Sequence, residues 1–252
     1  MRPYTVLCVA LAISPALVAQ SGSNDALARE IFKELVEINT TDTPAGNVTK
    51  AADAMAARLR AAGFAAADVR VLGPDPRKGN LVARLRGSGA KKPMLLLAHL
   101  DVVEAKREDW SVDPFTFLEK DGFFYGRGTS DDKSMAAQFV ANMIRLKREG
   151  VTFDRDLILA LTADEEGGRF NGVDWLVKNH RDLIDAEFAI NEGGGGTMHG
   201  GKYQTMEVQA SEKGNRFIRS SSNTKIFRRC TLQRGYSSEA WHFLPHAKKQ
   251  KW

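Results

Sequence analysis

A histidine and an aspartate stand two residues apart at the end of an apolar run, Met94-Leu95-Leu96-Leu97-Ala98-His99-Leu100-Asp101. An unbroken apolar run of this kind is typical of a buried strand in a parallel sheet. Residues i and i+2 of a strand share a face, so we expect the two side chains to emerge side by side. Ligands of open α/β sheets bind at the carboxyl ends of the strands. The pair therefore predicts a site at one edge of a sheet.

Four more carboxylates follow or lie near the ends of other predicted strands. They are Asp131, the adjacent pair Glu165 and Glu166, and Glu192. One imidazole and several carboxylates that converge on one sheet edge are the donor set of a hydrolytic metal site. The sequence therefore predicts metal-assisted hydrolysis.

Simpler interpretations of these residues stay open. His99 taken alone fits a hydrogen-bonded core histidine, and Asp101 fits a loop residue. Glu165 and Glu166 fit a solvated turn, although two acids directly after a buried strand and before Gly167 are poorly explained by solubility.

The other acids have structural alternatives as well. Asp131 or Asp132 could cap the helix predicted to start near Ser134, which is the more credible role for Asp132. Glu192 precedes four glycines, a sequence that also fits a flexible hinge. Nearby, we expect Lys133 and Arg127 to be structural ion-pair partners, and Trp110 and Phe115 to pack beneath the site.

The elements that must position these residues alternate along the chain. The alternation of strands with crossover helices predicts an α/β fold with a mostly parallel sheet. Asn24 is the expected N-cap of the first helix and Gly63 the expected C-cap of the second. Helices are predicted over residues 25–38, 48–62, 134–147 and 173–179. Strands are predicted over 69–72, 81–85, 94–99, 157–162 and 187–190, with a hairpin of 115–118 and 123–125.

The N-terminus has the pattern of a secretory signal peptide. Arg2 precedes an apolar stretch over 6–18 that ends in small residues, so cleavage is predicted after Ala19. The stretch is short for a membrane span and Pro15 interrupts it. Cleavage removes Cys8 and leaves Cys230 without a partner, so no intrachain disulfide is expected. We predict a secreted or periplasmic protein with no membrane attachment after cleavage.

Charge is distributed unevenly along the 252 residues. Residues 213–252 hold ten Lys and Arg against one acid, a net of +9, whereas residues 1–212 hold 26 basic and 30 acidic residues, a net of −4. Hydrophobic periodicity also stops near Lys213. We therefore predict a signal peptide over 1–19, a catalytic domain over 20–212 and an atypical basic tail over 213–252. A tail of this kind could bind nucleic acid, but it lacks interleaved aromatics and export argues against that partner.

Several motifs in order resemble one enzyme family. His99-Leu100-Asp101, the run from Tyr125 to Lys133 and Glu165-Glu166-Gly167-Gly168 are similar to the dinuclear zinc exopeptidases of metallopeptidase family M-twenty. That family includes carboxypeptidase G, aminoacylase and succinyl-diaminopimelate desuccinylase. The resemblance runs from about residue 26 to about residue 213. It implies a zinc-exopeptidase catalytic domain with helices on both faces of the sheet.

The resemblance also implies a set of metal ligands. His99 and Glu192 would bind one ion, Glu166 would bind the second, and Asp131 would bridge both. The family has a cis peptide after the bridging aspartate, which would here be Asp131-Asp132. Zn²⁺ is the expected ion, with Co²⁺ or Mn²⁺ as possible substitutes.

The same resemblance implies the catalytic roles. Two ions about 3.5 Å apart would hold and acidify a water, and Glu165 would be the general base. Asp101 would orient the imidazole of His99 from behind. The substrate would be a small peptide or an N-acyl amino acid.

Two parts of the family pattern are missing from this sequence. The lid and dimerisation domain and the last histidine ligand are not recognisable, so we expect an incomplete catalytic domain whose end, residues 213–252, is aberrant or out of frame. His199, His242, His246 and His180 are candidate replacements for that ligand, or surface histidines. The sequence does not distinguish a peptidase from a deacylase and does not indicate the oligomeric state. An alternative is that the chain is an inactive remnant of such an enzyme that only binds a metal or a peptide.

Overall fold

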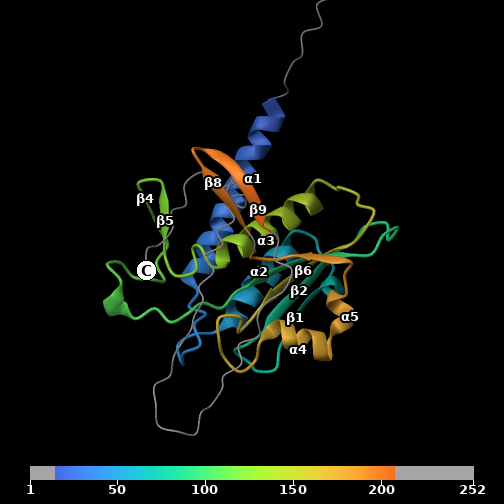
Figure 1. Cartoon of the computed structure of the whole chain (residues 1–252). Helices are drawn as coiled ribbons and strands as arrows, with labels where there is room; N and C mark the ends of the chain where they lie inside the picture. Colours follow the sequence, from blue (N-terminus) through green and yellow to red (C-terminus); the bar gives the residue numbers. More distant parts are fainter. Residues whose placement is uncertain (1–14, 194, 208–252) are drawn as a thin grey trace, which may run out of the picture.

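The computed structural model describes residues 15–193 and 195–207, and its centre is a five-stranded sheet (Figure 1). In spatial order its strands are β1 (Val69–Leu72), β2 (Asn80–Leu85), β6 (Leu157–Thr162), β3 (Met94–His99) and β7 (Phe188–Ile190). The helices are α1 (Pro15–Glu37), α2 (Val48–Ala61), α3 (Lys133–Arg148), α4 (Gly172–Asn179) and α5 (Arg181–Ile184), with 3₁₀ turns over Ala66–Asp68 and Arg107–Asp109.

The direction of the strands confirms a mostly parallel sheet. β3 is parallel to both β6 and β7. β2 is antiparallel to β6, and β1 is antiparallel to β2. Four of the five strands therefore run the same way and only β2 is reversed. This reversal brings the chain that enters β2 beside the carboxyl end of β6.

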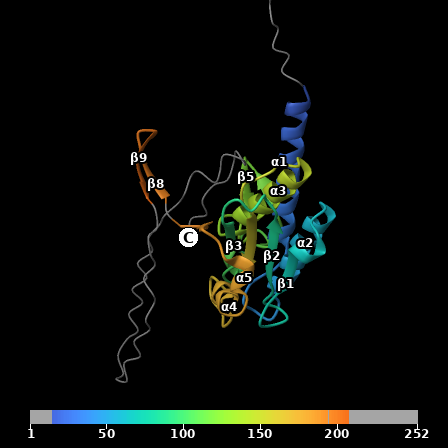
Figure 2. The ribbon, with the colours of Figure 1, turned by 90° about the vertical axis from the view of Figure 1, so that its right-hand side faces the viewer.

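Helices cover both faces of the sheet, as predicted (Figures 1 and 2). All six residues of β6 are buried because this strand lies at the centre of the sheet. Alternate residues of a strand face opposite sides. Accordingly Leu157, Leu159 and Leu161 join the core beneath α1, α2 and α3, whereas Ile158 and Ala160 pack with Leu176 of α4.

The first helix starts earlier than the sequence predicted. α1 begins at Pro15, so Asn24 lies inside the helix and does not cap it. Proline is favoured in the first turn of a helix because its missing N–H is not needed there, and the residues that follow continue the turn. The predicted cleavage point after Ala19 falls within α1. Within the described part of the chain, no helix has both the length and the apolarity that a membrane crossing requires.

The second and third helices agree with their predictions. The side chain of Asn47 accepts a hydrogen bond from the Lys50 amide (3.2 Å) and caps α2, which ends just before Gly63 (φ 90°). Glycine tolerates this positive φ because it has no Cβ. α3 covers 133–148 and packs against α1.

Two hairpins lie outside the central sheet. β4 (Leu118–Lys120) and β5 (Phe123–Tyr125) pair around a two-residue turn, Asp121-Gly122, in which both φ angles are positive. The prediction that the first strand spans 115–118 was wrong, because this tight turn pairs Lys120 directly with Phe123 and so sets the register. β8 (Gly195–His199) and β9 (Lys202–Glu207) form the second hairpin, which the glycine-rich sequence did not predict.

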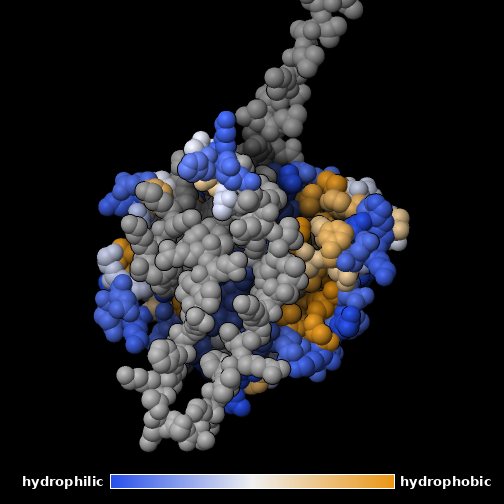
Figure 3. All heavy atoms as spheres, viewed as in Figure 1, coloured by the Kyte–Doolittle hydropathy of each residue, from blue (hydrophilic) through white to orange (hydrophobic). Residues whose placement is uncertain are grey.

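Most of the large apolar side chains are buried, and the exceptions include the edge strand β7. Phe188 and Ile190 of β7 are 48% and 44% exposed. Figure 3 shows apolar residues gathered on the right-hand side of its view, between charged residues. The charged surface elsewhere is what a folded domain presents to water.

Candidate metal centre

His99 is the last residue of β3 and only 2% of it is exposed. Its Nδ1 lies 3.0 Å from the main-chain oxygen of Asp101. A carbonyl oxygen only accepts hydrogen bonds, so Nδ1 carries the proton and donates it there. Nε2 lies on the opposite side of the ring, 2.9 Å from the Asp131 carboxylate, and it presents a lone pair to a metal ion once it has given up its proton. Metal-binding histidines are oriented by this kind of contact.

Three acids surround Nε2 of His99. The nitrogen lies 2.9 Å from Asp131 Oδ1, 3.4 Å from Glu192 Oε1 and 3.7 Å from Glu165 Oε2. Glu165 follows β6 and Glu192 follows β7, the two strands on either side of β3. Because these three strands are parallel, their carboxyl ends meet at one edge of the sheet, as the sequence predicted.

His99, Asp131 and Glu192 form a group that could hold a metal ion. Each offers one ligand atom, and these atoms lie within 4.8 Å of one another. An imidazole nitrogen with carboxylate oxygens is a donor set that suits a divalent transition metal. The residues therefore fit the ion that the sequence resemblance implied.

The peptide bond between Asp131 and Asp132 is cis, as the resemblance implied. Asp132 occupies the N-cap position of α3, but its side chain makes no capping hydrogen bond. Instead its Oδ2 accepts a hydrogen bond from the backbone N–H of His99 at 3.2 Å. The capping role considered for Asp132 is therefore replaced by a contact that holds the end of β3.

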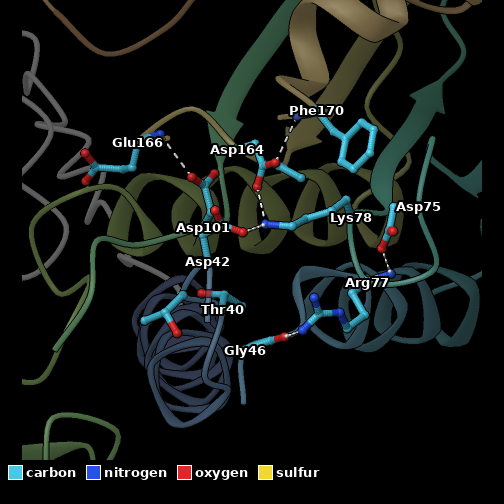
Figure 4. A network of polar contacts seen from close by, with 12 residues as sticks. Thr40, Asp42, Gly46, Asp75, Arg77, Lys78, Asp101, Asp164, Glu166 and Phe170 are labelled. Carbon is cyan, nitrogen blue, oxygen red and sulfur yellow. Dashed lines mark hydrogen bonds and ion pairs between the residues drawn. The ribbon is translucent and has the colours of Figure 1, made fainter. Parts of the chain in front are cut away.

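Asp101 holds the segment that carries the two adjacent glutamates. Its Oδ1 accepts a hydrogen bond from the Glu165 amide (3.1 Å) and its Oδ2 one from the Glu166 amide (3.0 Å; Figure 4). The carboxylate lies 3.6 Å from Nδ1 of His99, farther than the main-chain oxygen of the same residue. Asp101 thus contacts the imidazole mainly through its backbone and the glutamate segment through its side chain.

The electrostatics of this group favour a bound cation. Burial lowers the pKa of His99, but the hydrogen bonds that its ring donates to Asp101 and Asp131, together with the nearby negative charges, outweigh burial and raise the pKa to about 12. Burial, with the charges of neighbouring acids, raises the pKa of both Glu166 and Glu192 to about 7. Acids whose ionisation is opposed in this way are stabilised by a positive charge between them.

Two basic residues beside the acids have mainly structural contacts. Lys133 is fully buried, burial lowers its pKa to about 7, and its Nζ donates to the carbonyl oxygen of Ile38 (2.7 Å), which ties the start of α3 to the end of α1. The Arg127 guanidinium lies 5.0 Å from the centroid of the Trp110 ring and donates to the Glu104 carbonyl at 3.3 Å. These contacts are to carbonyl oxygens and an aromatic ring, so the ion pairs predicted for both cations stay a prediction.

The structure adds a pair of residues that the sequence analysis did not single out. The Lys78 ammonium pairs with the carboxylate of Asp164, the residue just before Glu165, and also with Asp42 at 2.6 Å (Figure 4). Lys78 is 86 residues away from Asp164 in the chain, so no local pattern signals the contact. In the sequence Asp164 is one of three consecutive acids, and nothing local distinguishes its role from those of Glu165 and Glu166.

Two of the candidate replacement histidines, His199 and His180, lie within the described residues, and neither is assembled with these acids. His199 lies in β8 and is exposed, and His180 ends α4 with its ring 4.8 Å from that of Trp175. Within residues 15–193 and 195–207, the one group of three or more metal-ligating residues is that of His99, Asp131 and Glu192. His242 and His246 lie outside the described residues.

Comparison with protein families gives a match over more than half of the chain. Residues 95–243 match the model described as peptidase family M20/M25/M40. The matched range includes the metal-ligating group and also extends into the segment from residue 213 onward. The boundary predicted near residue 213 remains a prediction.

Curated relatives are similar in sequence. The chain is 33% identical over 168 residues to aminoacylase-1 of Sus scrofa, which covers 65% of this chain and 40% of that protein. It is 34% identical over 196 residues to succinyl-diaminopimelate desuccinylase of Delftia acidovorans, covering 73% of this chain and 50% of that protein. The chain therefore spans about half, or less, of the length of these relatives.

Solved structures show the same fold. An M20 family metallo-carboxypeptidase from Sulfolobus solfataricus matches with a TM-score of 0.57 at 20% identity, over 67% of this chain and 37% of that chain. The dipeptidase Dug1p from Saccharomyces cerevisiae matches with a TM-score of 0.57 at 21% identity, over 73% of this chain and 42% of that chain. At these identities the likeness concerns the fold of the central sheet and its helices.

Proposed function

Because this chain belongs to peptidase family M20/M25/M40, we propose that it is a zinc-dependent hydrolase of amide bonds in small peptides or N-acyl amino acids. The observation that carries the proposal is the convergence of His99, Asp131 and Glu192 from three separate segments on one sheet edge. His99 is buried, Glu192 is half-buried and Asp131 is exposed, so the three donors meet at a position that a cation can reach from solvent. An imidazole with carboxylates is a donor set that binds Zn²⁺.

In this proposal His99, Asp131 and Glu192 would hold one Zn²⁺, and Glu166 would contribute a ligand to a second. When bound, the metal supplies a Lewis acid for the substrate carbonyl and lowers the pKa of water. The protein side fixes the donor atoms. The Nδ1–H of His99 is donated to the Asp101 carbonyl, so Nε2 is the nitrogen that would bind the ion in place of its proton.

Glu165 is the proposed general base. Its Oε2 lies 3.7 Å from Nε2 of His99, at the rim of the ligand group, and its side chain is 46% exposed. From there it can accept a proton from the attacking water on a carboxylate oxygen and return it to the nitrogen of the leaving amine. The Asp101 carboxylate, which accepts from the Glu165 amide, keeps the backbone of this residue in place.

The substrate class follows from the relatives rather than from a described pocket. One relative is named an aminoacylase and another a desuccinylase of an amino acid, and two structural neighbours are a carboxypeptidase and a dipeptidase. All four names refer to an amide bond next to an amino acid. We therefore propose a small substrate that carries one.

The test is zinc content and turnover of the purified full chain. Elemental analysis after dialysis against Zn²⁺ should find bound metal, and a panel of N-acetyl amino acids, N-succinyl amino acids and dipeptides should include a substrate. His180→Ala, which changes a histidine away from the group, is the control and should retain both properties. A folded chain that holds no metal after dialysis against excess Zn²⁺ would contradict the proposal.

A second candidate function is favoured by one specific observation. Glu166 is not part of the three-residue ligand group within the described residues, and no histidine there accompanies it. A chain that holds one ion and turns nothing over would be a metal- or peptide-binding relative of these enzymes. One bound zinc with no hydrolysis of any member of the panel would support this reading.

We also propose that the protein is exported, on the strength of the sequence pattern of residues 1–19. Signal peptidase recognises small residues after an apolar stretch. Edman sequencing of protein recovered from the periplasm or medium should start at Gln20. A mature protein that begins at Met1 would contradict this proposal.

A further inference from the structure

We propose that Lys78 is a positioning residue that holds the loop over residues 164–171, here called the glutamate loop, in the geometry that Glu165 and Glu166 need. This rests on the proposed function, in which Glu165 is the base and Glu166 a metal ligand. The ion pairs of Lys78 are with Asp164 and Asp42 and not with the ligand group. It acts through Asp164, the first residue of the glutamate loop.

The position of Lys78 follows from the topology of the sheet. β2 runs antiparallel to β6, with Leu81 opposite Leu161, so the residues just before β2 lie beside the carboxyl end of β6. Because the two segments are adjacent, Oδ1 of Asn80 accepts a hydrogen bond from the Ala163 amide at 2.9 Å. Two residues earlier, Lys78 reaches Asp164. Only 6% of Lys78 and 2% of Asp164 are exposed.

Asp164 organises the glutamate loop around its own carboxylate. Its Oδ2 accepts a hydrogen bond from the Phe170 amide (3.1 Å), and its main-chain oxygen accepts one from Asn171 Nδ2 (3.3 Å). Gly168 packs so closely that a Cβ there would lie 2.3 Å from Oδ2 of Asp164. The glutamate loop is therefore folded over one buried acid, and Lys78 supplies the positive charge for that acid.

Lys78 also links the glutamate loop to a second segment. Its Nζ lies 2.6 Å from Asp42, in the loop between α1 and α2. In the same loop the Thr40 hydroxyl donates to the Leu100 carbonyl at 2.7 Å, next to Asp101. Lys78 thus joins the segment that follows β6 to one that is fixed against the end of β3, where His99 lies.

Burial makes this link more than a surface ion pair. Removing one partner of a buried pair leaves an uncompensated charge, which the structure relieves by local rearrangement. The rearrangement here would occur one residue from Glu165. A displacement of about 1 Å in a catalytic group can reduce the rate about 100-fold.

A matched control lies on the same strand. Arg84 in β2 pairs with Asp156, the residue just before β6, at 3.1 Å and is partly buried. This pair flanks the opposite end of β6, away from the metal centre. Lys78→Met removes a cation just before β2, and Arg84→Met removes one within β2. Each variant therefore breaks one ion pair to an acid that flanks β6.

Three measurements on the full-length chain compare the two variants. Hydrogen exchange reports the backbone amides of Glu165, Glu166 and Phe170, competition with a chelator gives the zinc affinity, and kinetics separate kcat from KM. We expect Lys78→Met to accelerate exchange at these amides, to weaken zinc binding about 10-fold or more, and to lower kcat about 100-fold with a smaller change in KM. Arg84→Met should change none of these, and Lys78→Arg should recover part of each loss.

The outcomes that would overturn the proposal are distinct. Exchange and zinc affinity in Lys78→Met equal to those in Arg84→Met would remove the positioning role. Faster exchange with unchanged zinc affinity and kcat would make the pair structural only. If Lys78→Met does not fold, Asp42→Asn decides instead, because Asp42 is 56% exposed and its loss leaves the buried Lys78 still paired with Asp164. Asp42→Asn should accelerate exchange, weaken zinc binding and lower kcat, each by several-fold. If none of the three quantities changes, the proposal is overturned.

The exchange measurement separates this proposal from the proposed function. A wild-type chain without zinc or turnover would refute the function. Faster exchange in Lys78→Met would still establish that Lys78 holds the glutamate loop.

Discussion

The carboxylate of Asp101 accepts a hydrogen bond from the backbone amide of Glu166 at 3.0 Å, while the main-chain oxygen of Asp101 accepts from the imidazole of His99. One residue thereby orients both the imidazole of His99 and the segment that carries Glu166, the two side chains that we propose as metal ligands. The two contacts come from different atoms, so substitution of the side chain affects them separately.

Asp101→Ala is expected to weaken zinc binding about 10- to 100-fold, because the amides of Glu165 and Glu166 lose their acceptor. Asp101→Asn keeps one acceptor oxygen and should lose less. Zinc titration of the two variants measures the difference. Equal losses in both would show that the negative charge, rather than the two hydrogen bonds, is what matters.

Glu165→Gln should abolish most turnover and leave the metal bound. The amide side chain keeps the shape of glutamate but cannot take up the proton, and general-base catalysis contributes about 10²- to 10⁴-fold. Steady-state kinetics and elemental analysis on the same sample check both parts. Turnover at the wild-type rate would remove Glu165 from the proposed role.

Zinc should stabilise the folded chain through His99. A ligand that binds only the folded state at about 100 times its Kd adds about 2.7 kcal/mol to the free energy of unfolding. We expect a gain of that order in urea unfolding of the wild type and its loss on treatment with EDTA. His99→Ala should show no gain, whereas His180→Ala should behave as wild type. An equal gain in His99→Ala would place the zinc elsewhere.

The contribution of Lys78 to stability should disappear only at high pH. Burial lowers the pKa of Lys78, but the hydrogen bonds and charges of Asp164 and Asp42 outweigh it and raise the pKa above 10.5. Below 10.5 the ammonium is charged in both the folded and the unfolded chain, so its stabilisation is complete, and it is lost as the pH rises through the higher folded pKa.

Removal of one partner of a buried pair costs about 3 kcal/mol or more. The difference in unfolding free energy between wild type and Lys78→Met should be of this size from pH 7 to pH 10 and should narrow above 10.5. Arg84→Met is the control, because arginine stays charged over this range. A difference that does not narrow would mean that packing of the lysine stem, rather than its charge, stabilises the fold.

The central strands and one hairpin could be predicted because local sequence patterns specify them. The apolar run that ends at His99 and the run over 157–162 are long enough to indicate central strands, and both are found there. The Asp121-Gly122 turn predicted a hairpin for a similar reason. The start of α1 was misplaced, because Asn24 is a good cap by type but nothing local requires a helix to begin there.

The amino-acid sequence was enough to indicate which residue types could bind a cation and, through the carboxyl ends of parallel strands, that His99 and Glu192 would meet. Asp131 precedes α3 and is not at a strand end of the sheet, so its position beside them, and the contacts that hold all three, depend on the folded structure. The contacts of Asp132 with the His99 amide, of Asp101 with two amides and of Lys78 with Asp164 join residues 33 to 86 positions apart. Such pairs depend on the order of the strands and on the reversed direction of β2. No local periodicity encodes either, because the periodicity of a segment specifies which face a residue occupies and not which distant residue it contacts.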